Sequence, residues 1–93
     1  MDVVWDPEKA RSNLRKHNVD FADAAIALED ENALSLLDDQ HIEYRFRTLA
    51  RGPHPDVLLI VHSEQDEETI RIISARKATK EEERQYFTGD FNE

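Results

Sequence analysis

The sequence has 93 residues, of which 39% are hydrophobic and 35% are charged, and this composition predicts one folded domain over residues 1–93. Cysteine, transmembrane-length apolar runs and a signal-peptide pattern at the N-terminus are all absent from the sequence, which predicts a cytoplasmic protein without membrane contact, disulfides or thiolate metal sites. The net charge of −9 argues against a uniformly basic nucleic-acid binder.

The charged residues are unevenly distributed. Every charged residue from Asp20 to Glu43 is acidic, and a second acidic group occupies residues 64–68. Basic residues gather in other stretches, at residues 9–16, 45–51 and 71–84. We therefore expect the folded chain to present a positive face opposite a negative one.

The first third of the sequence predicts a short edge strand and two helices. The strand covers residues 1–5, and Asp6-Pro7 then begins a basic helix, because Asp caps the free amides and Pro fits the first helical position. Asn18 is expected to end this helix in a left-handed conformation. Asp20 caps a second helix, whose charged residues are all acidic.

The middle of the sequence predicts strands. A short apolar run at 33–37 is followed by an alternating, two-faced strand over 43–51, a Gly-Pro loop, and an apolar run at 57–63 that suits the centre of a sheet. Residues 69–76 alternate again, and the pattern places Ile70, Ile72 and Ser74 on one face with Arg71, Ile73 and Ala75 on the other. Consecutive hairpins imply antiparallel pairing.

The end of the sequence predicts a short helix. Thr79 and Glu82 have the spacing of a capping box, Gly89 marks the end, and Tyr86 and Phe87 are the residues that can anchor the helix. The predicted fold class is therefore α+β, with two N-terminal helices on one face of an antiparallel sheet, a short C-terminal helix, and a second face that stays partly open.

A set of arginines is the first candidate site. Arg45, Arg47 and Arg51 share one side of their strand, and Arg71 has a comparable placement on another strand. Converging guanidinium groups would form a phosphate-binding surface. The same pattern also fits a solvated arginine face balanced by carboxylates, and the sequence leaves both interpretations open.

The junction after the last strand is the second candidate. Arg76-Lys77 ends the strand, and the helix that follows brings Glu83, Arg84 and Tyr86 nearby. Metal-free RNA cleavage must activate the 2′-hydroxyl, stabilise the phosphorane charge and protonate the leaving oxygen, which these residue types can share. An ordinary charged helix surface with a docking tyrosine is the competing interpretation.

Of the four histidines, His62 is the best acid or base candidate, because it closes the central strand and is expected on the open face beside Arg71. His17 fits a packed position at a helix end, and His41 and His54 fit loops. No metal-binding motif is present, and two glycines cannot form a glycine-rich phosphate loop, so we expect neither a metal nor a cofactor.

Two separated blocks of the sequence closely resemble the BrnT toxin family. The resembling residues are Trp5-Asp6-Pro7, Lys9-Ala10, Asn13, Lys16-His17, Val19, Phe21, Ala24, the stretch 71–78, Glu83-Arg84 and Tyr86. The resemblance covers nearly the whole chain in order. Ala50 departs from the family pattern, in which glycine often stands near that point, and the glycine here is displaced to Gly52.

The resemblance implies a RelE-like fold and a ribonuclease that halts translation. It further implies neutralisation by a BrnA-like antitoxin with a ribbon-helix-helix DNA-binding region, in a complex expected to be a heterotetramer that contacts DNA only through the antitoxin. The resemblance also implies that catalysis uses an arginine on a late strand and a tyrosine in the C-terminal helix. The residues of those types here are Arg76 and Tyr86, and Lys77, Glu83 and Arg84 are adjacent.

The leading hypothesis is a metal-independent endoribonuclease. In it, Arg76 and an open-face arginine hold the scissile phosphate, while Tyr86, Glu83 or His62 moves protons. The candidate RNA-binding residues are Arg45, Arg47, Arg71, Lys77, Arg84 and Lys16. The alternative is a catalytically inactive RelE-like module whose acidic helix face docks a basic antitoxin and which acts only through that partner.

Overall fold

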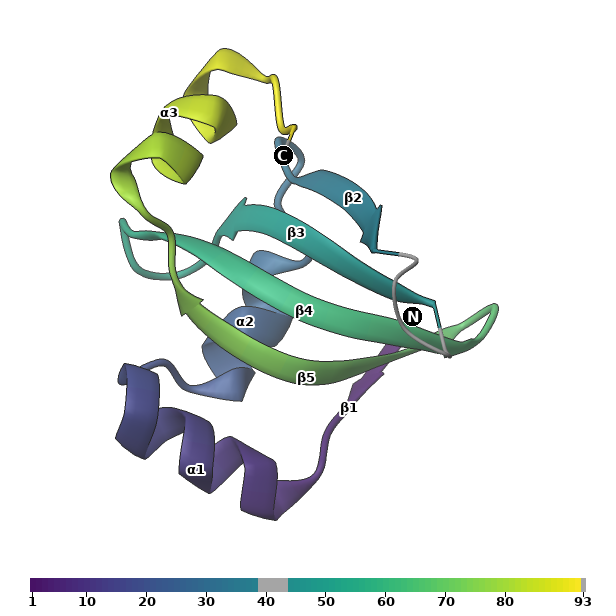
Figure 1. Cartoon of the computed structure of the whole chain (residues 1–93). Coiled ribbons are helices and arrows are strands. Elements are labelled where there is room, and N and C mark those ends of the chain that lie inside the picture. Colours follow the sequence, from purple (N-terminus) through teal and green to yellow (C-terminus); the bar gives the residue numbers. More distant parts are fainter. Residues whose placement is uncertain (39–43, 93) are drawn as a thin grey trace.

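A computed structural model describes residues 1–38 and 44–92 of the chain as one sheet with three helices (Figure 1). The elements in chain order are β1 (Asp2–Val4), α1 (Pro7–His17), α2 (Phe21–Ala27), β2 (Leu34–Asp38), β3 (Arg45–Arg51), β4 (Val57–Asp66), β5 (Thr69–Lys77) and α3 (Lys80–Thr88). The predicted α+β class is confirmed. None of the described helices is long and apolar enough to cross a membrane.

The sheet has the strand order β1-β5-β4-β3-β2, so the apolar strand β4 is central, as predicted. Strands β2 to β5 pair in antiparallel fashion, but β1 runs parallel to β5. The sheet is therefore mixed rather than antiparallel. Hairpin patterns fix the direction of neighbours in sequence, whereas β1 joins β5 from the other end of the chain, and no turn determines its direction.

The helix ends follow the local signals in the sequence. The Asp6 and Asp20 carboxylates each accept a backbone amide hydrogen bond of 2.9 Å in the first turn of their helices. Asn18 ends α1 with a φ of 56°, and Gly89 ends α3 with a φ of 75°. These backbone conformations suit Asn and Gly, which adopt the left-handed region at low cost.

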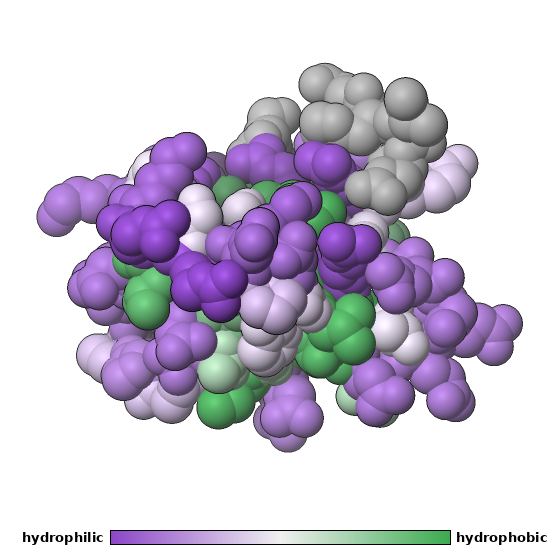
Figure 2. All heavy atoms as spheres, turned by 90° about the horizontal axis from the view of Figure 1, so that it is seen from below, coloured by the Kyte–Doolittle hydropathy of each residue, from purple (hydrophilic) through white to green (hydrophobic). Residues whose placement is uncertain are grey.

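The helices divide between the two faces of the sheet. α1 and α2 lie on one face (Figure 1), where Phe21 and Ala24 of α2 pack with Ile60, Ile72 and Ala75 in the main core. Seen from the α1 side, the surface is mostly hydrophilic with small, separated apolar patches (Figure 2). The outer side of this layer is thus solvated while its inner side forms the core.

α3 lies on the opposite face and covers only part of it. Tyr86 packs there against Leu49, Val57 and Leu59 in a second, smaller core. The rest of this face, which we call the open face, carries the arginines of β3 and β5. In this structure α3 therefore leaves part of the second face uncovered.

Asn13 fastens α1 to the sheet. Its side chain is buried, and its Nδ2 atom donates to the carbonyl oxygens of Val19 at 3.0 Å and Ala75 at 2.8 Å. Its Oδ1 atom accepts from the Ala75 amide at 3.1 Å. One amide side chain therefore satisfies backbone groups of β5 and of the connection between α1 and α2, which gives this residue of the resembling block a structural role.

The loop after β3 packs tightly onto α2 at Gly52. A Cβ atom placed there would lie 3.0 Å from both the Ala27 Cβ and the Asp23 carbonyl oxygen. Contacts this short are tighter than most Cβ atoms make, so a side chain here would force the backbone of α2 to shift by a few tenths of an ångström, and glycine avoids that shift.

Strand β5 departs from the predicted alternation. Val61 pairs with Ser74 and His62 pairs with Ile72, so Ile73 is an extra residue in β5, a β-bulge. Ile72 and Ala75 consequently lie in the same core, although alternation predicted them on opposite faces. The prediction is wrong beyond Ile72, because a bulge reverses the phase of the strand and leaves no sign in the pattern of apolar residues.

Candidate active site

Four arginines line the open face. Arg45 and Arg71 flank Ser63 of the central strand in cross-strand register, and Arg76 lies opposite Leu59. Arg47 lies between these positions, two residues from Arg45 on β3, and therefore on the same face. Cross-strand neighbours share a face, so Arg45, Arg47 and Arg71 lie together on this face of the sheet. Arg51, which the sequence grouped with them, lies on the same side of β3, with its guanidinium 5.5 Å from the centre of the Phe87 ring.

The carboxylate of Glu82 joins two of these arginines. Arg76 binds it through both guanidinium Nη atoms, at 2.8 and 3.0 Å, and the Arg47 Nη2 atom lies 3.9 Å from its Oε2 atom. The Glu82 side chain is 11% exposed, against 23% for Arg47 and 35% for Arg76. The Glu82 carboxylate is thus largely shielded from solvent, whereas both arginine side chains remain partly exposed.

Helix α3 places Glu82 by its capping box. The Glu82 carboxylate accepts the Thr79 amide at 2.8 Å, and the Thr79 hydroxyl accepts the Glu82 amide at 3.1 Å. The bonds from Arg76 are the main reason why the pKa of Glu82 is lowered, opposed by burial and aided by Thr79. Glu82 is therefore ionised at neutral pH.

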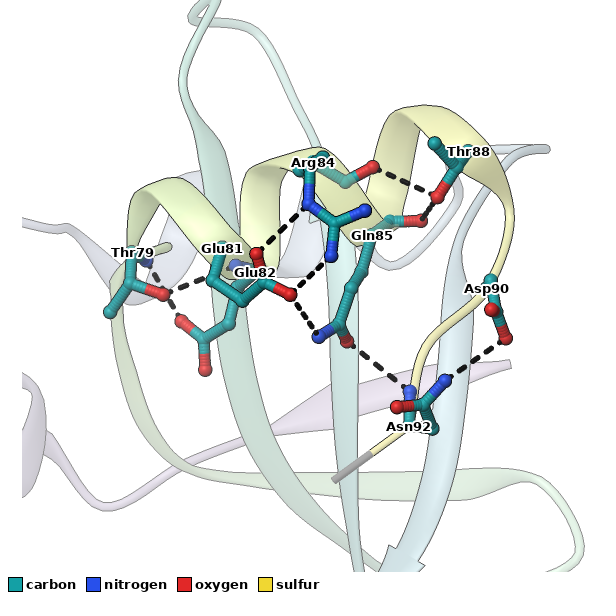
Figure 3. A network of polar contacts seen from close by, with 8 residues as sticks. All are labelled: Thr79, Glu81, Glu82, Arg84, Gln85, Thr88, Asp90 and Asn92. Atoms are coloured by element: carbon teal, nitrogen blue, oxygen red, sulfur yellow. Dashed lines mark hydrogen bonds and ion pairs between the residues drawn. The ribbon is translucent and has the colours of Figure 1, made fainter.

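Several other polar side chains of α3 form hydrogen bonds along its outer side (Figure 3). Arg84 is bound by Glu81, and Gln85 connects the helix to Asn92 beyond it. Glu83 is exposed on this helix. Of the acidic residues in the first turn, Glu82 and not Glu83 is the one that reaches the arginines.

Tyr86 is directed into the fold. It is 6% exposed, and its hydroxyl donates to the Asp30 Oδ2 atom at 2.5 Å. Burial, followed by the hydrogen bond to Asp30, raises the pKa of Tyr86, so the phenol stays protonated at neutral pH. The structure therefore places Tyr86 as an anchor between α3 and the loop before β2. Phe87 is exposed beside it, under the Arg51 guanidinium at 5.5 Å.

His62 does not lie on the open face, which corrects the expectation from the sequence. It is in register with Phe46 and Ile72, on the face that α1 and α2 cover. It stacks on Phe46 and its Nε2 atom is 2.7 Å from the Thr48 hydroxyl. In the described part of the chain its Nδ1 atom has no hydrogen-bond partner. Burial lowers the pKa of His62 to about 4, so the ring is neutral at pH 7.

The other candidate residues lie away from the arginines. Lys77 is in register with Leu58 of the main core, and its Nζ atom is 3.6 Å from Asp56. Lys16 is exposed on α1, on the far side of the sheet. His54 is 3.1 Å from Asp23 in the loop region. His41 lies outside the described residues.

The residue that sequence reasoning missed is Glu82. Its place in the capping box was predicted, but its side chain was interpreted only as a helix-surface charge. A signal was available, since the carboxylate at the third helical position of a capping box points back toward the N-cap, and Arg76 lies three residues before the cap Thr79. Among residues 1–38 and 44–92, no group of three His, Asp or Glu side chains is placed to hold a metal ion.

Comparison with known proteins identifies a family and a similar solved structure. The family model for the ribonuclease toxin BrnT of type II toxin-antitoxin systems matches residues 5–82. The structure of the Brucella abortus ribonuclease toxin BrnT is similar with a TM-score of 0.65 and 22% sequence identity, covering 86% of this chain and 99% of that chain. This likeness concerns the fold. No match was found among curated proteins.

Proposed function

Since this chain belongs to the BrnT family of ribonuclease toxins of type II toxin-antitoxin systems, we propose that it cleaves RNA on the open face of its sheet, at Arg76, Glu82 and Arg47. The observation that carries this proposal is the Glu82 carboxylate held between two partly exposed guanidinium groups. It combines a proton acceptor with cationic phosphate ligands within one site.

The proposed reaction uses the RNA's own 2′-hydroxyl. Its oxygen attacks the adjacent phosphorus, the bond from phosphorus to the 5′-oxygen breaks, and the products are a 2′,3′-cyclic phosphate and a 5′-hydroxyl. Arg76 and Arg47 hold the phosphate and stabilise the added negative charge of the phosphorane, and Glu82 accepts the proton of the 2′-hydroxyl. The leaving 5′-oxygen takes its proton from water.

The ion pair adjusts the basicity of Glu82. In the free protein the Arg76 hydrogen bonds hold the pKa of Glu82 down, which makes the carboxylate a weak base. A bound phosphate competes for the same guanidinium, so it weakens these bonds and raises the pKa of Glu82. The base becomes stronger when substrate is present. Because the guanidinium groups supply the positive charge, we propose that the reaction does not depend on a metal ion.

We propose a BrnA-like antitoxin as the partner, in a heterotetramer that contacts DNA through the antitoxin. The acidic residues Asp20 and Asp23 lie at the start of α2, across the sheet from the arginines, and the other acidic residues of this stretch follow in the loop that leads toward Tyr86. A basic antitoxin segment would be attracted to this side. In this arrangement RNA binds to one face of the sheet and the antitoxin binds on the opposite side.

A catalytically inactive binding module remains the second candidate, favoured by the net charge of −9. An acidic protein repels RNA at long range, whereas it attracts a basic antitoxin. The two candidates differ in whether the chain alone cleaves RNA.

The test is induction of the chain alone in a bacterium, followed by growth and RNA integrity, together with cleavage by purified protein in EDTA. Arg76→Ala and Glu82→Gln are expected to lower the cleavage rate by about 10²-fold or more. Glu83→Gln and Arg11→Ala are the matched controls, since both side chains are exposed, and both should cleave like the wild type. A harmless wild-type chain, or equal rates for Glu82→Gln and Glu83→Gln, would contradict the proposal.

A further inference from the structure

The open face has a second polar feature, at the end away from Glu82. An open hollow of about 400 Å³ lies where Arg45 and Arg71 flank Ser63. Both arginines are half-buried and Ser63 is buried. The two guanidinium groups approach the hollow from strands on either side of β4.

Two β-bulges shape this hollow. Ile73 is the extra residue of β5, and Gln65 is an extra residue of β4, because Glu64 pairs with Ile70 while Asp66 pairs with Thr69. Both bulged residues line the hollow. Bulges redirect the side chains beside them and are frequent next to functional sites. Here they bracket the short segment of β5 that carries Arg71.

The charge of the lining favours an anion. Lys9 of α1 reaches the same hollow, so cations from three different elements, α1, β3 and β5, meet there, and among the described lining residues Glu64 carries the one carboxylate. Three elements that each contribute one cation make a more specific anion site than a run of basic residues on one element.

The hollow is too far from Glu82 for one phosphate to contact both places, so it cannot hold the scissile phosphate. Through the strand register, Arg71 corresponds to Arg45 on β3 and Arg76 corresponds to Leu49. These positions are four residues apart on one strand, which is a separation of about 13 Å. Arg47 lies between these two positions on the same side of β3.

We propose that this hollow binds a second, non-scissile phosphate of the RNA substrate. The inference rests on the function proposed above and specifies its substrate class, an RNA strand with more than one internucleotide phosphate. A dinucleoside monophosphate has a single phosphate and cannot fill both places. The hollow therefore selects for longer RNA and fixes which way the strand crosses the sheet.

The test measures binding of 2′-O-methyl oligonucleotides, which lack the attacking hydroxyl and stay intact. Arg71→Gln is expected to raise the Kd for a 2′-O-methyl hexanucleotide about tenfold, as for the loss of one charge-assisted contact. The slope of log Kd against log salt concentration should fall by about 1. The Kd for a 2′-O-methyl dinucleoside monophosphate should change less than twofold. Arg11→Gln, which removes the same charge from an exposed site on α1, is the control.

Lys9→Gln provides a second variant, because its exposed side chain can be changed without disturbing the sheet, and it should weaken hexanucleotide binding in the same direction. Equal hexanucleotide affinities for Arg71→Gln, Lys9→Gln and Arg11→Gln would overturn the second phosphate site. So would an equal loss of affinity for both oligonucleotides. Cleavage of unmodified RNA by the wild type is measured separately, so that failure of the ribonuclease function is distinguished from failure of this site.

Discussion

Replacing Tyr86 with Phe separates the two roles that its position allows. The substitution keeps the ring packed on Leu49, Val57 and Leu59 and removes only the hydroxyl that donates to Asp30. If Tyr86 anchors α3, as its burial indicates, the variant is less stable and cleaves RNA at the wild-type rate. If Tyr86 moves a proton in the reaction, its rate falls by about 10²-fold or more.

The expected loss of stability follows from the partners of Asp30. A hydrogen bond to a charged group contributes about 1.5–3 kcal/mol. The Asp30 carboxylate is half-buried and keeps two backbone donors, the amides of Arg51 at 2.8 Å and Asn32 at 2.9 Å. Because water and these donors still solvate the charge, the lower end applies, about 1.5 kcal/mol. This corresponds to a melting temperature lower by roughly 6–12 °C for a domain of this size.

The pH dependence of this loss has a defined sign. Burial opposes ionisation of Asp30, but the hydrogen bonds from Tyr86, Arg51 and Asn32 outweigh it and hold the pKa of Asp30 below its ordinary value of 3.8. A lowered carboxyl pKa contributes stability above the unfolded value, and that contribution disappears as the pH falls through the folded value. The difference between wild type and Tyr86→Phe should therefore be full at pH 7 and shrink below about pH 4.

Urea unfolding at pH 7 and at a pH below 4 measures the difference in stability, and single-turnover cleavage of RNA measures the rate. Tyr44→Phe is the matched control, because Tyr44 is 70% exposed and the same atom is removed. A Tyr86→Phe variant with wild-type stability would refute the anchoring role. Wild-type stability combined with a large loss of rate would establish a catalytic one.

Two further predictions concern buried polar residues. Asn13→Ala removes three hydrogen bonds and leaves backbone groups of Val19 and Ala75 without partners, so urea unfolding should show a loss of about 3 kcal/mol or more. Burial lowers the pKa of His62 in the folded protein to about 4. As the pH falls, the His62 side chain of the unfolded chain therefore takes up a proton first, near pH 6.5. The free energy of unfolding should decline between about pH 6.5 and pH 4, by up to about 3 kcal/mol. His62→Gln should flatten that decline in unfolding curves across this range, and an unchanged slope would contradict the assignment.

The helix boundaries were predictable because their causes are local. Asp6, Asn18 and Asp20 act on amides or on a backbone conformation within a few residues of themselves, as does the pair Thr79 and Glu82. The central position of β4 was also predictable, since a strand that is apolar on both faces must be covered on both.

The direction of His62 was not predictable from its own strand. Residues 57–61 are all apolar, so alternation gives no phase, and the phase is set by the partner Phe46 on β3. The bulge at Ile73 was hidden for a related reason, because isoleucine is compatible with either face. Both errors arise in strands that are apolar on both faces, because such strands lack the alternation of apolar and polar residues from which the direction of a side chain is predicted.

The arginine surface was predicted in part. Arg45 and Arg47 followed from alternation on a strand with a clear polar side, and Arg76 followed from the family resemblance. The carboxylate that joins Arg76 to Arg47 depends on how α3 packs on the sheet, and that packing depends on Tyr86 and Asp30, which are 56 residues apart in the sequence. Contacts of this range leave no periodic signal.

The pairing of β1 with β5 has a consequence for how the protein is made. Residues 2–4 find their partners at residues 69–71, and Asn13 bonds to Ala75. The N-terminal strand and helix therefore have no completed docking surface while the first two thirds of the chain are being synthesised, and folding must wait for β5. Arg76 and Glu82 follow immediately behind. The ribosome thus releases the last strand and the proposed site almost together, and no shorter nascent chain carries an assembled toxin.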